Sequence, residues 1–148
     1  MFKYDSIADL IAEAQKRGKN ISDIVIEEQA EACETTEEKM YERMLNSFKI
    51  MQMSIENGME KDTRSVSGLT GGSAWKMKQR VDSGENICGH VFGEAMSMAL
   101  AVAETNACMG KIVAAPTAGS CGIMPAAIVS VMNEKKIPVK KVVMSLFT

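Results

Sequence analysis

The stretch AAPTAGSCGIMP, which spans Ala114–Pro125, predicts a tight turn that leads directly into a helix. Pro116 fixes its own φ angle and favours an extended backbone at the residue before it. Gly119 and Gly122 can adopt φ angles that other residues avoid, or let the backbone approach a bound group. The proline that closes the stretch is typical of the first turn of a helix, where its missing N–H would have no partner. We therefore expect an apolar helix over 123–135.

Small residues before a helix can also form a binding site. The N-terminus of a helix presents unpaired N–H groups and a partial positive charge, so this loop could bind a carboxylate or a phosphate. Thr117 and Ser120 add hydroxyl groups at the same place. An ordinary turn between two elements would use the same residues. From the residues alone, an anion site and a structural turn both stay open.

A second loop of this kind, SGLTGG, spans Ser67–Gly72 and precedes a predicted helix over Ser73–Val81. The two glycines at its end give a flexible turn whose N–H groups could form another anion-binding nest. Here too, a plain turn is the alternative.

Several motifs around the two loops resemble a known family. They are Asn106-Ala107, Gly110-Lys111-Ile112-Val113, the pattern Ala115-Pro116-Thr117-x-Gly119-x-x-Gly122, Ser67–Gly72, and an opening that runs from Phe2 through Ser6-Ile7 to Ile21-Ser22. Together they resemble the iron–sulfur-dependent bacterial L-serine dehydratases, and among these the alpha chain of the two-subunit form. The resemblance covers essentially the whole chain, and it implies the N-terminal half of a longer alpha region, truncated at its C-terminal end.

The resemblance also implies a chemistry. Such enzymes convert L-serine to pyruvate and ammonia without pyridoxal phosphate, and a 4Fe-4S cluster held by three cysteines acts as Lewis acid on the serine hydroxyl. A beta subunit is the implied partner, and a homo-oligomer is possible. The positions that match the family's substrate-binding loops are Ser67, Gly68, Thr70, Gly71, Gly72, Thr117, Gly119, Ser120 and Gly122.

The chain has four cysteines, and they form no C-x-x-C pair: Cys33, Cys88, Cys108 and Cys121. We expect Cys33 and Cys108 to pack in the core, since free cysteine is among the most buried residue types. Cys88 and Cys121 each adjoin a glycine in a loop. The resemblance implies that the cluster cysteines lie beyond this chain. We therefore expect no metal ligand and no cluster here, with Cys121 as the candidate to test first, and an inactive fragment.

Two other side chains could carry chemistry. His90 is the only histidine, and both a catalytic role and a structural or exposed one stay open. Lys111 could in principle hold pyridoxal phosphate, although a lysine beside a glycine is usually solvated. The catalytic base is not identifiable from the sequence.

Composition sets further limits. The 148 residues can form one domain over 1–148, and the low aromatic content of 5% with 13 methionines favours a helical core. A net charge of -2 gives no reason to expect nucleic acid or an anionic membrane as partner. Met1–Asp5 opens without an apolar leader, and no apolar run is long enough to span a membrane, so we expect a cytoplasmic protein.

Apolar residues recur with helical spacing along the chain, which predicts a mainly α, compact domain of six or seven helices. The expected helices are Ser6–Gly18, Ser22–Cys33, Thr35–Gly58, Ser73–Val81, a centrally buried His90–Cys108, 123–135, and one from Val139. In the last of these, we expect an exposed apolar stripe and hence self-association or a disordered tail: Ile137, Val142, Val143, Leu146 and Phe147. A non-catalytic helical interaction or regulatory module is the alternative function.

Overall fold

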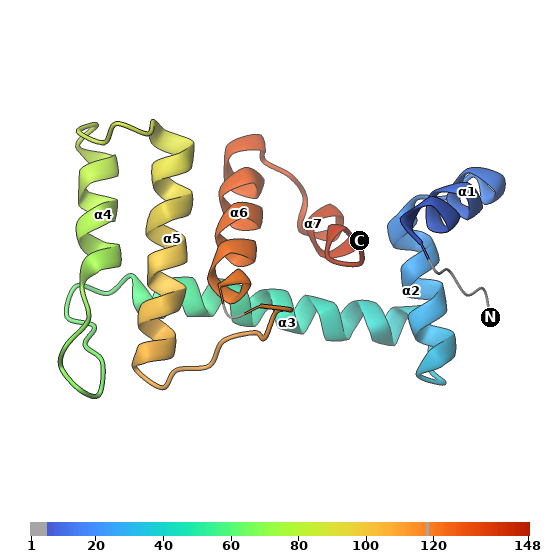
Figure 1. The fold of residues 1–148 in the computed structure, drawn as a ribbon, viewed down its shortest axis with the longest axis horizontal. Coiled ribbons are helices and arrows are strands. Elements are labelled where there is room, and N and C mark those ends of the chain that lie inside the picture. Colours follow the sequence, from blue (N-terminus) through green and yellow to red (C-terminus); the bar gives the residue numbers. More distant parts are fainter. Residues whose placement is uncertain (1–5, 118) are drawn as a thin grey trace. The chain divides into compact units, whose positions relative to one another are not determined.

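The computed structural model describes residues 6–117 and 119–148 (Figure 1). Within these residues the chain forms seven α-helices and no strand, so the predicted mainly α fold is confirmed. The helices are α1 Ile7–Arg17, α2 Ile21–Ala32, α3 Glu37–Gly58, α4 Ser73–Asp82, α5 His90–Ala107, α6 Ser120–Lys135 and α7 Val139–Ser145. The start of the family resemblance at Phe2, the opening Met1–Asp5, and Ala118 of the second loop lie outside the described residues. No helix in the described part of the chain is long and apolar enough to cross a membrane.

The helices belong to two compact units, which are described separately below. One unit contains residues 6–46 and 138–148, and the other contains residues 47–137. The boundary between them falls within α3. Both loops that the sequence singles out lie in the unit of residues 47–137.

Short-range signals define the helix ends of the first unit. The Ser6 hydroxyl accepts a hydrogen bond from the Asp9 amide at 3.2 Å, and Gly18 ends α1 with a left-handed φ of 63°. Both features confirm the predicted limits of this helix. The next helix begins at Ile21, one residue earlier than expected, because Asn20 and Asp23 form a reciprocal capping box.

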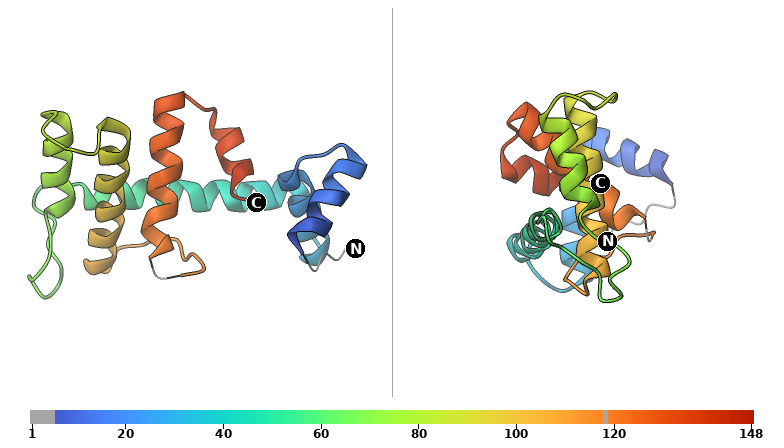
Figure 2. Two further views of the ribbon diagram at one scale, coloured as in Figure 1. Left: turned by 45° about the horizontal axis from the view of Figure 1, so that its top comes forward. Right: turned by 90° about the vertical axis from the view of Figure 1, so that its left-hand side faces the viewer.

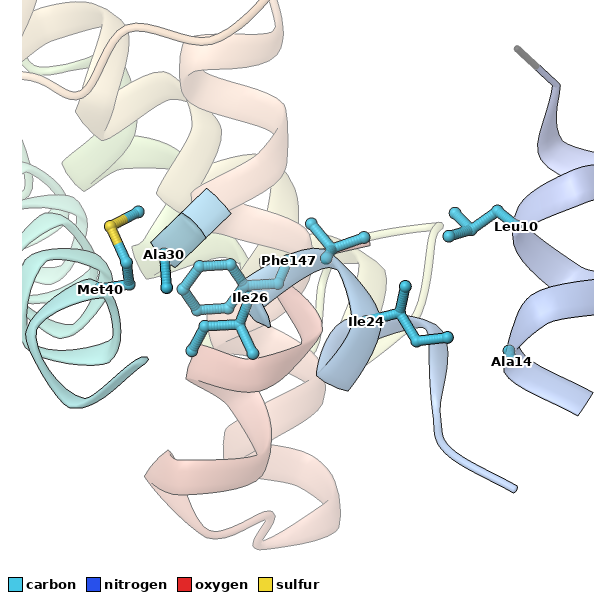
Figure 3. Packing of buried hydrophobic residues seen from close by; sticks show 8 residues of the cluster. Leu10, Ala14, Ile24, Ile26, Ala30, Met40 and Phe147 are labelled. Atoms are coloured by element: carbon cyan, nitrogen blue, oxygen red, sulfur yellow. The ribbon is translucent and has the colours of Figure 1, made fainter. Parts of the chain in front are cut away.

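The core of the first unit includes a residue from the end of the chain. Figure 3 shows Phe147 among the buried apolar side chains of α1, α2 and the start of α3. The members of this cluster are Leu10, Ala14, Ile24, Val25, Ile26, Ala30, Met40 and Phe147. Because α7 packs against α2, a helix that also presents apolar side chains, the last helix finds its partner within the same unit.

This packing contradicts the exposed stripe predicted for the end of the chain. Val142, Val143 and Phe147 are only 4%, 0% and 2% exposed, and Ile137 and Leu146 are half-buried. The prediction failed because helical periodicity identifies an apolar face without showing which other helix covers it.

In the second unit, α4, α5 and α6 lie side by side, with α5 in the middle (Figures 1 and 2). The Thr105 hydroxyl donates to the carbonyl of Ser54 at 2.6 Å, which ties α5 to the last turns of α3. The expectation of a centrally buried helix is confirmed for one side of α5, where Ala101 and Val102 are buried. It is wrong for another side, where Phe92 is 61% exposed and the neighbouring Met96 is also exposed.

The helix after the second loop begins at Ser120, three residues before the predicted start at 123. The amides of Gly122 and Ile123 both donate to the carbonyl of Gly119, so the first turn forms within the loop itself. Pro125 is then the sixth residue of α6 and not part of its first turn. The predicted start was too late because it placed this proline in the first turn, whereas the structure has it inside the helix, where it cannot donate to the carbonyl four residues earlier.

Candidate functional site

The loop Ser67–Gly72 is closed by its own hydrogen bonds. The amide of Ser65 donates to the carbonyl of Thr70 at 2.9 Å, and the amide of Thr70 donates back to the Ser65 hydroxyl at 3.2 Å. Within this frame the Gly68 amide donates to the Ser65 carbonyl at 2.9 Å. The hydroxyls of Ser65 and Ser67 lie 3.2 Å apart. Leu69, at the tip, is exposed. The loop therefore presents Ser67, Gly68 and Leu69 outward from a fixed base.

The base of this loop requires glycine. Gly71 has a φ of 144°, and a Cβ there would lie 2.1 Å from the carbonyl oxygen of Thr63. Gly72 has a φ of 77° and lies against the side chain of Arg64. A side chain at Gly71 would displace the backbone of Thr63 and Arg64. A side chain at Gly72 would require a strained positive φ and a shift of the Arg64 side chain.

The anion nest predicted at Gly72 exists, and the anion is a carboxylate of the same chain. The amides of Gly72, Ser73 and Ala74 donate to the Glu104 carboxylate at 2.9, 2.6 and 3.2 Å. Glu104 belongs to α5 and is only 6% exposed. No sequence motif had pointed to this residue. An acidic residue within a largely apolar helix was the available signal, since a buried carboxylate needs hydrogen-bond donors or a cation.

The loop before α6 is also held by internal hydrogen bonds. The Thr117 hydroxyl donates to the Ser120 hydroxyl at 3.0 Å, and the Ser120 hydroxyl donates to the Thr117 carbonyl at 2.7 Å. The amide of Ser120 donates to the Thr117 carbonyl, and that of Gly122 to the Gly119 carbonyl. An anion site, which the sequence left open beside a structural turn, would need amides in this loop that face a ligand. The amides of Ser120 and Gly122 are instead used within the loop, because its residues already form the first turn of α6.

A cavity of about 420 Å³ lies beside this second loop. It is lined by Met96, Ala99, Leu100, Val102, Ala103, Asn106, Ile112, Gly119, Cys121, Gly122 and Ile123. Of the predicted site residues it includes Gly119 and Gly122, but not the hydroxyl residues Thr117 and Ser120, and nothing from Ser67–Gly72. Asn106 contributes a side-chain amide to an otherwise largely apolar wall. The cavity therefore contains only part of the predicted site, and the two loops do not share it.

A wider apolar groove of about 760 Å³ lies between α5 and α6. Phe92 and Met96 of α5 and Ile123 and Val131 of α6 are among its lining residues, and all four are exposed. His90 lies at this groove as the first residue of α5 and is exposed. The groove presents apolar side chains and few groups that could do acid–base chemistry.

The cysteines do not pack as predicted. Cys33 is exposed and Cys108 is half-buried, because each follows the last residue of a helix and does not lie on its apolar face. The Cys108 thiol donates to the carbonyl of Arg64 at 2.9 Å. Cys88 is exposed, and the half-buried Cys121 lines the 420 Å³ cavity, where its sulfur accepts from the Ala115 amide at 3.3 Å.

These residues do not fit a 4Fe-4S cluster. Such a cluster needs three thiolates at fixed spacing, and residues 6–117 and 119–148 contain no group of three histidine, cysteine or acidic side chains able to hold a metal ion. Lys111, the residue considered for pyridoxal phosphate, is exposed and lines neither of the cavities described above.

The described residues define a mainly helical protein in which two glycine-rich loops each lead into a helix. The chain belongs to the serine dehydratase alpha-chain family, whose sequence profile matches residues 16–148. This membership confirms the family resemblance seen in the sequence.

Relatives with assigned names agree with the family. The chain is 33% identical over 145 residues to a probable L-serine dehydratase alpha chain of Bacillus subtilis, covering 98% of this chain and 48% of that protein. It is 37% identical over 122 residues to an L-serine dehydratase alpha chain of Peptoniphilus asaccharolyticus. This match covers 82% of this chain and 42% of that protein. L-serine dehydratase 2 of Escherichia coli is 29% identical over 136 residues, which cover 86% of this chain and 28% of that protein. The chain thus spans about half the length, or less, of these relatives. No solved structure matches it.

Proposed function

We propose that this chain forms part of the alpha chain of an L-serine dehydratase, a lyase that converts L-serine to pyruvate and ammonia. The observation that carries the proposal is the family match over residues 16–148, which includes both glycine-rich loops. The name that two of the relatives carry, L-serine dehydratase alpha chain, suggests both the substrate and a second kind of chain. We therefore also propose a beta chain as partner. A cytoplasmic location and a homo-oligomer stay predictions.

The proposed substrate-binding groups come from the two loops: Ser67, Gly68, Thr70, Gly71, Gly72, Thr117, Gly119, Ser120 and Gly122. Their support is the family match together with the cavity beside Gly119 and Gly122. At about 420 Å³ this cavity is of a size that small-molecule sites have. Asn106 offers an amide donor and acceptor on its α5 wall.

The reaction has two stages. A base removes the Cα proton of L-serine, and the β-hydroxyl leaves as water to give aminoacrylate. Water then hydrolyses the tautomeric imine to pyruvate and ammonia. The Cα proton is weakly acidic and hydroxide is a poor leaving group, so the first stage requires a base and an acid close to the substrate. The described residues do not identify the base.

A 4Fe-4S cluster is the cofactor that the family resemblance implies. Since the described residues do not bring three thiolates together, we propose that residues outside this chain hold the cluster in the complete enzyme. The contribution of this chain would then be to position the substrate.

A helical interaction module is the second candidate function. It is favoured by the groove of about 760 Å³ between α5 and α6, because contiguous exposed apolar surface marks interaction sites. In that case changes in either loop would leave L-serine turnover intact.

The test uses the complete enzyme, with its full alpha and beta chains, and measures pyruvate formed from L-serine. Ser120→Ala removes a hydroxyl that fixes the second loop, and we expect the KM for L-serine to rise about tenfold because substrate positioning is lost. Ser130→Ala is the matched control, since its hydroxyl donates to the Ala127 carbonyl within the same helix and lies away from the loop. Equal KM values for Ser120→Ala and the unmodified enzyme would show that the second loop is not part of the substrate-binding site. Absence of L-serine turnover by the unmodified enzyme would contradict the proposed function.

A further inference from the structure

The contacts of Glu104 extend the site beyond the residues that the sequence suggested. Its carboxylate accepts from three consecutive backbone amides, those of Gly72, Ser73 and Ala74. These residues are the end of the Ser67–Gly72 loop and the start of α4. Glu104 lies 30 to 32 positions further along the chain than these residues, so a single side chain fixes the exit of this loop onto α5.

The burial of the carboxylate makes this attachment hard to replace. Glu104 is only 6% exposed, and its hydrogen bonds in the structure come from these three amides. A buried carboxylate without donors is strongly unfavourable, whereas hydrogen bonds to an ionised acceptor at a helix N-terminus are strong. Movement of the loop away from α5 would therefore leave both the carboxylate and the amides unsatisfied.

A second contact holds the entrance of the same loop. Directly after the last residue of α5, the Cys108 thiol donates to the carbonyl of Arg64 at 2.9 Å. Arg64 immediately precedes the self-closed segment that begins at Ser65. Glu104 and Cys108 thus hold the two ends of the loop against one helix.

The same part of α5 forms a wall of the cavity beside the second loop. Ala103 and Asn106 line that cavity, and Glu104 lies between them in the sequence while contacting the first loop. One turn of α5 is therefore common to the first loop and to the cavity beside the second.

We propose that Glu104 is a positioning residue of the L-serine site, whose carboxylate fixes the Ser67–Gly72 loop on α5 at a constant place relative to the cavity. This inference rests on the proposed function. It removes Gly72 from the proposed substrate-binding groups, because the amides of Gly72, Ser73 and Ala74 hold Glu104. Substrate then meets the outer part of the loop, at Ser67 and Gly68.

Two measurements on matched variants test the proposal. Glu104→Gln keeps the shape of the side chain but replaces one acceptor oxygen by an NH₂ group. This donor would face backbone N–H groups, which are donors too, so hydrogen bonds would be lost. Glu104→Asp keeps the charge on a shorter side chain. Thr105→Val is the control, since it removes a buried hydrogen bond from the adjacent position of α5, to Ser54, without touching the loop.

The first measurement uses the chain itself. We expect Glu104→Gln to raise the hydrogen-exchange rate of the amides of residues 72–74 by about tenfold or more, since their shared acceptor is weakened. Peptide-resolved alkylation of Cys108 should also become faster. Thr105→Val should change neither rate, and Glu104→Asp should give intermediate rates.

The second measurement uses the complete enzyme. We expect Glu104→Gln to raise the KM for L-serine about tenfold with kcat within about twofold, because an interaction that positions substrate is lost. Glu104→Asp should recover part of the affinity. An unchanged KM in Glu104→Gln, or an equal rise in Thr105→Val, would overturn the proposal. If the unmodified enzyme does not convert L-serine, the proposed function is wrong, and the exchange rates alone then decide whether Glu104 positions the loop.

Discussion

Gly58, the last residue of α3, lies directly against the backbone of Ala101 in α5. A Cβ placed on Gly58 would be 1.8 Å from the carbonyl oxygen of Ala101 and 2.8 Å from its Cα. The two helices can approach this closely only because position 58 has no side chain. The same crossing contains the hydrogen bond from Thr105 to the Ser54 carbonyl. The crossing therefore holds α5 against the last turns of α3.

Gly58→Ala should destabilise the unit of residues 47–137. The added methyl group would meet backbone atoms, which cannot rotate away, so we expect a loss of about 2 kcal/mol or more in the free energy of unfolding. Chemical denaturation with circular dichroism measures this loss. Gly119→Ala is the control, since a Cβ there has nothing within 4 Å. If both variants unfold at the same denaturant concentration, the close crossing of α3 and α5 is wrong.

Phe147→Ala should destabilise the other unit. The ring is 2% exposed and packs in the cluster that contains Ile26, Ala30 and Met40. Truncating a buried phenylalanine costs about 3–5 kcal/mol, through lost burial and the cavity that remains. The measurement is the thermal unfolding midpoint of Phe147→Ala. Val139→Ala is the control, since this position of α7 is 44% exposed. A similar small effect of the two changes would support the exposed C-terminal stripe that the sequence had suggested.

The sequence predicted the helices better than it predicted what they contact. Caps and glycines are local signals, so Ser6 and Gly18 located the ends of α1 correctly. The burial of Val143 and Phe147 depends on α2, and the periodicity of one helix does not identify its partner. Tertiary contacts of this kind were the main source of error.

The candidate site shows the same limit. The sequence identified the nest at Gly72 from its glycines, but its anion, Glu104, comes from a distant helix that reads as apolar. It also identified Gly119 and Gly122, which do line a cavity. It could not show that the hydroxyls of Thr117 and Ser120 bond to each other, because this depends on where the first turn of α6 begins.

The ion pairs of Lys78 predict that the free energy of unfolding falls at high pH. Hydrogen bonds to Asp82 and then Glu94 raise the pKa of this lysine above its ordinary value of 10.5, against a smaller opposing effect of burial. The Nζ of Lys78 lies 2.9 Å from the Glu94 carboxylate, which links α4 to α5. A raised pKa means that the folded chain binds the proton more tightly than the unfolded chain. The stabilisation is therefore complete below pH 10.5 and is lost as the pH rises through the folded pKa.

Urea unfolding of the unmodified chain and of Lys78→Met, from about pH 9 to about pH 11.5, measures this contribution. The difference in free energy of unfolding between the two should shrink as the pH rises. Lys76→Met, at an exposed position of the same helix, is the matched control for replacing a lysine of α4 by methionine. A constant difference for Lys78→Met would mean that its ion pairs do not stabilise the fold.

The last prediction concerns iron. A 4Fe-4S cluster needs three thiolates held close together by a folded scaffold. Cys33 belongs to one compact unit, and Cys88, Cys108 and Cys121 belong to the other. The thiol of Cys108 faces the Arg64 carbonyl while that of Cys121 faces the loop before α6, and the described residues offer no group of three ligands. We therefore expect this chain alone to take up no stoichiometric cluster and to form no pyruvate from L-serine.

Anaerobic reconstitution with iron and sulfide tests this expectation, with visible absorbance and iron content as readouts and a pyruvate assay to follow. The full-length alpha chain of Peptoniphilus asaccharolyticus, treated in the same way, is the comparison, since it contains more than twice the matched length. Uptake of one cluster per chain by the 148-residue protein, with turnover of L-serine, would show that its own cysteines are ligands. Cys121→Ser would then be the first variant to examine, because Cys121 alone among the cysteines lines the cavity beside Gly119 and Gly122.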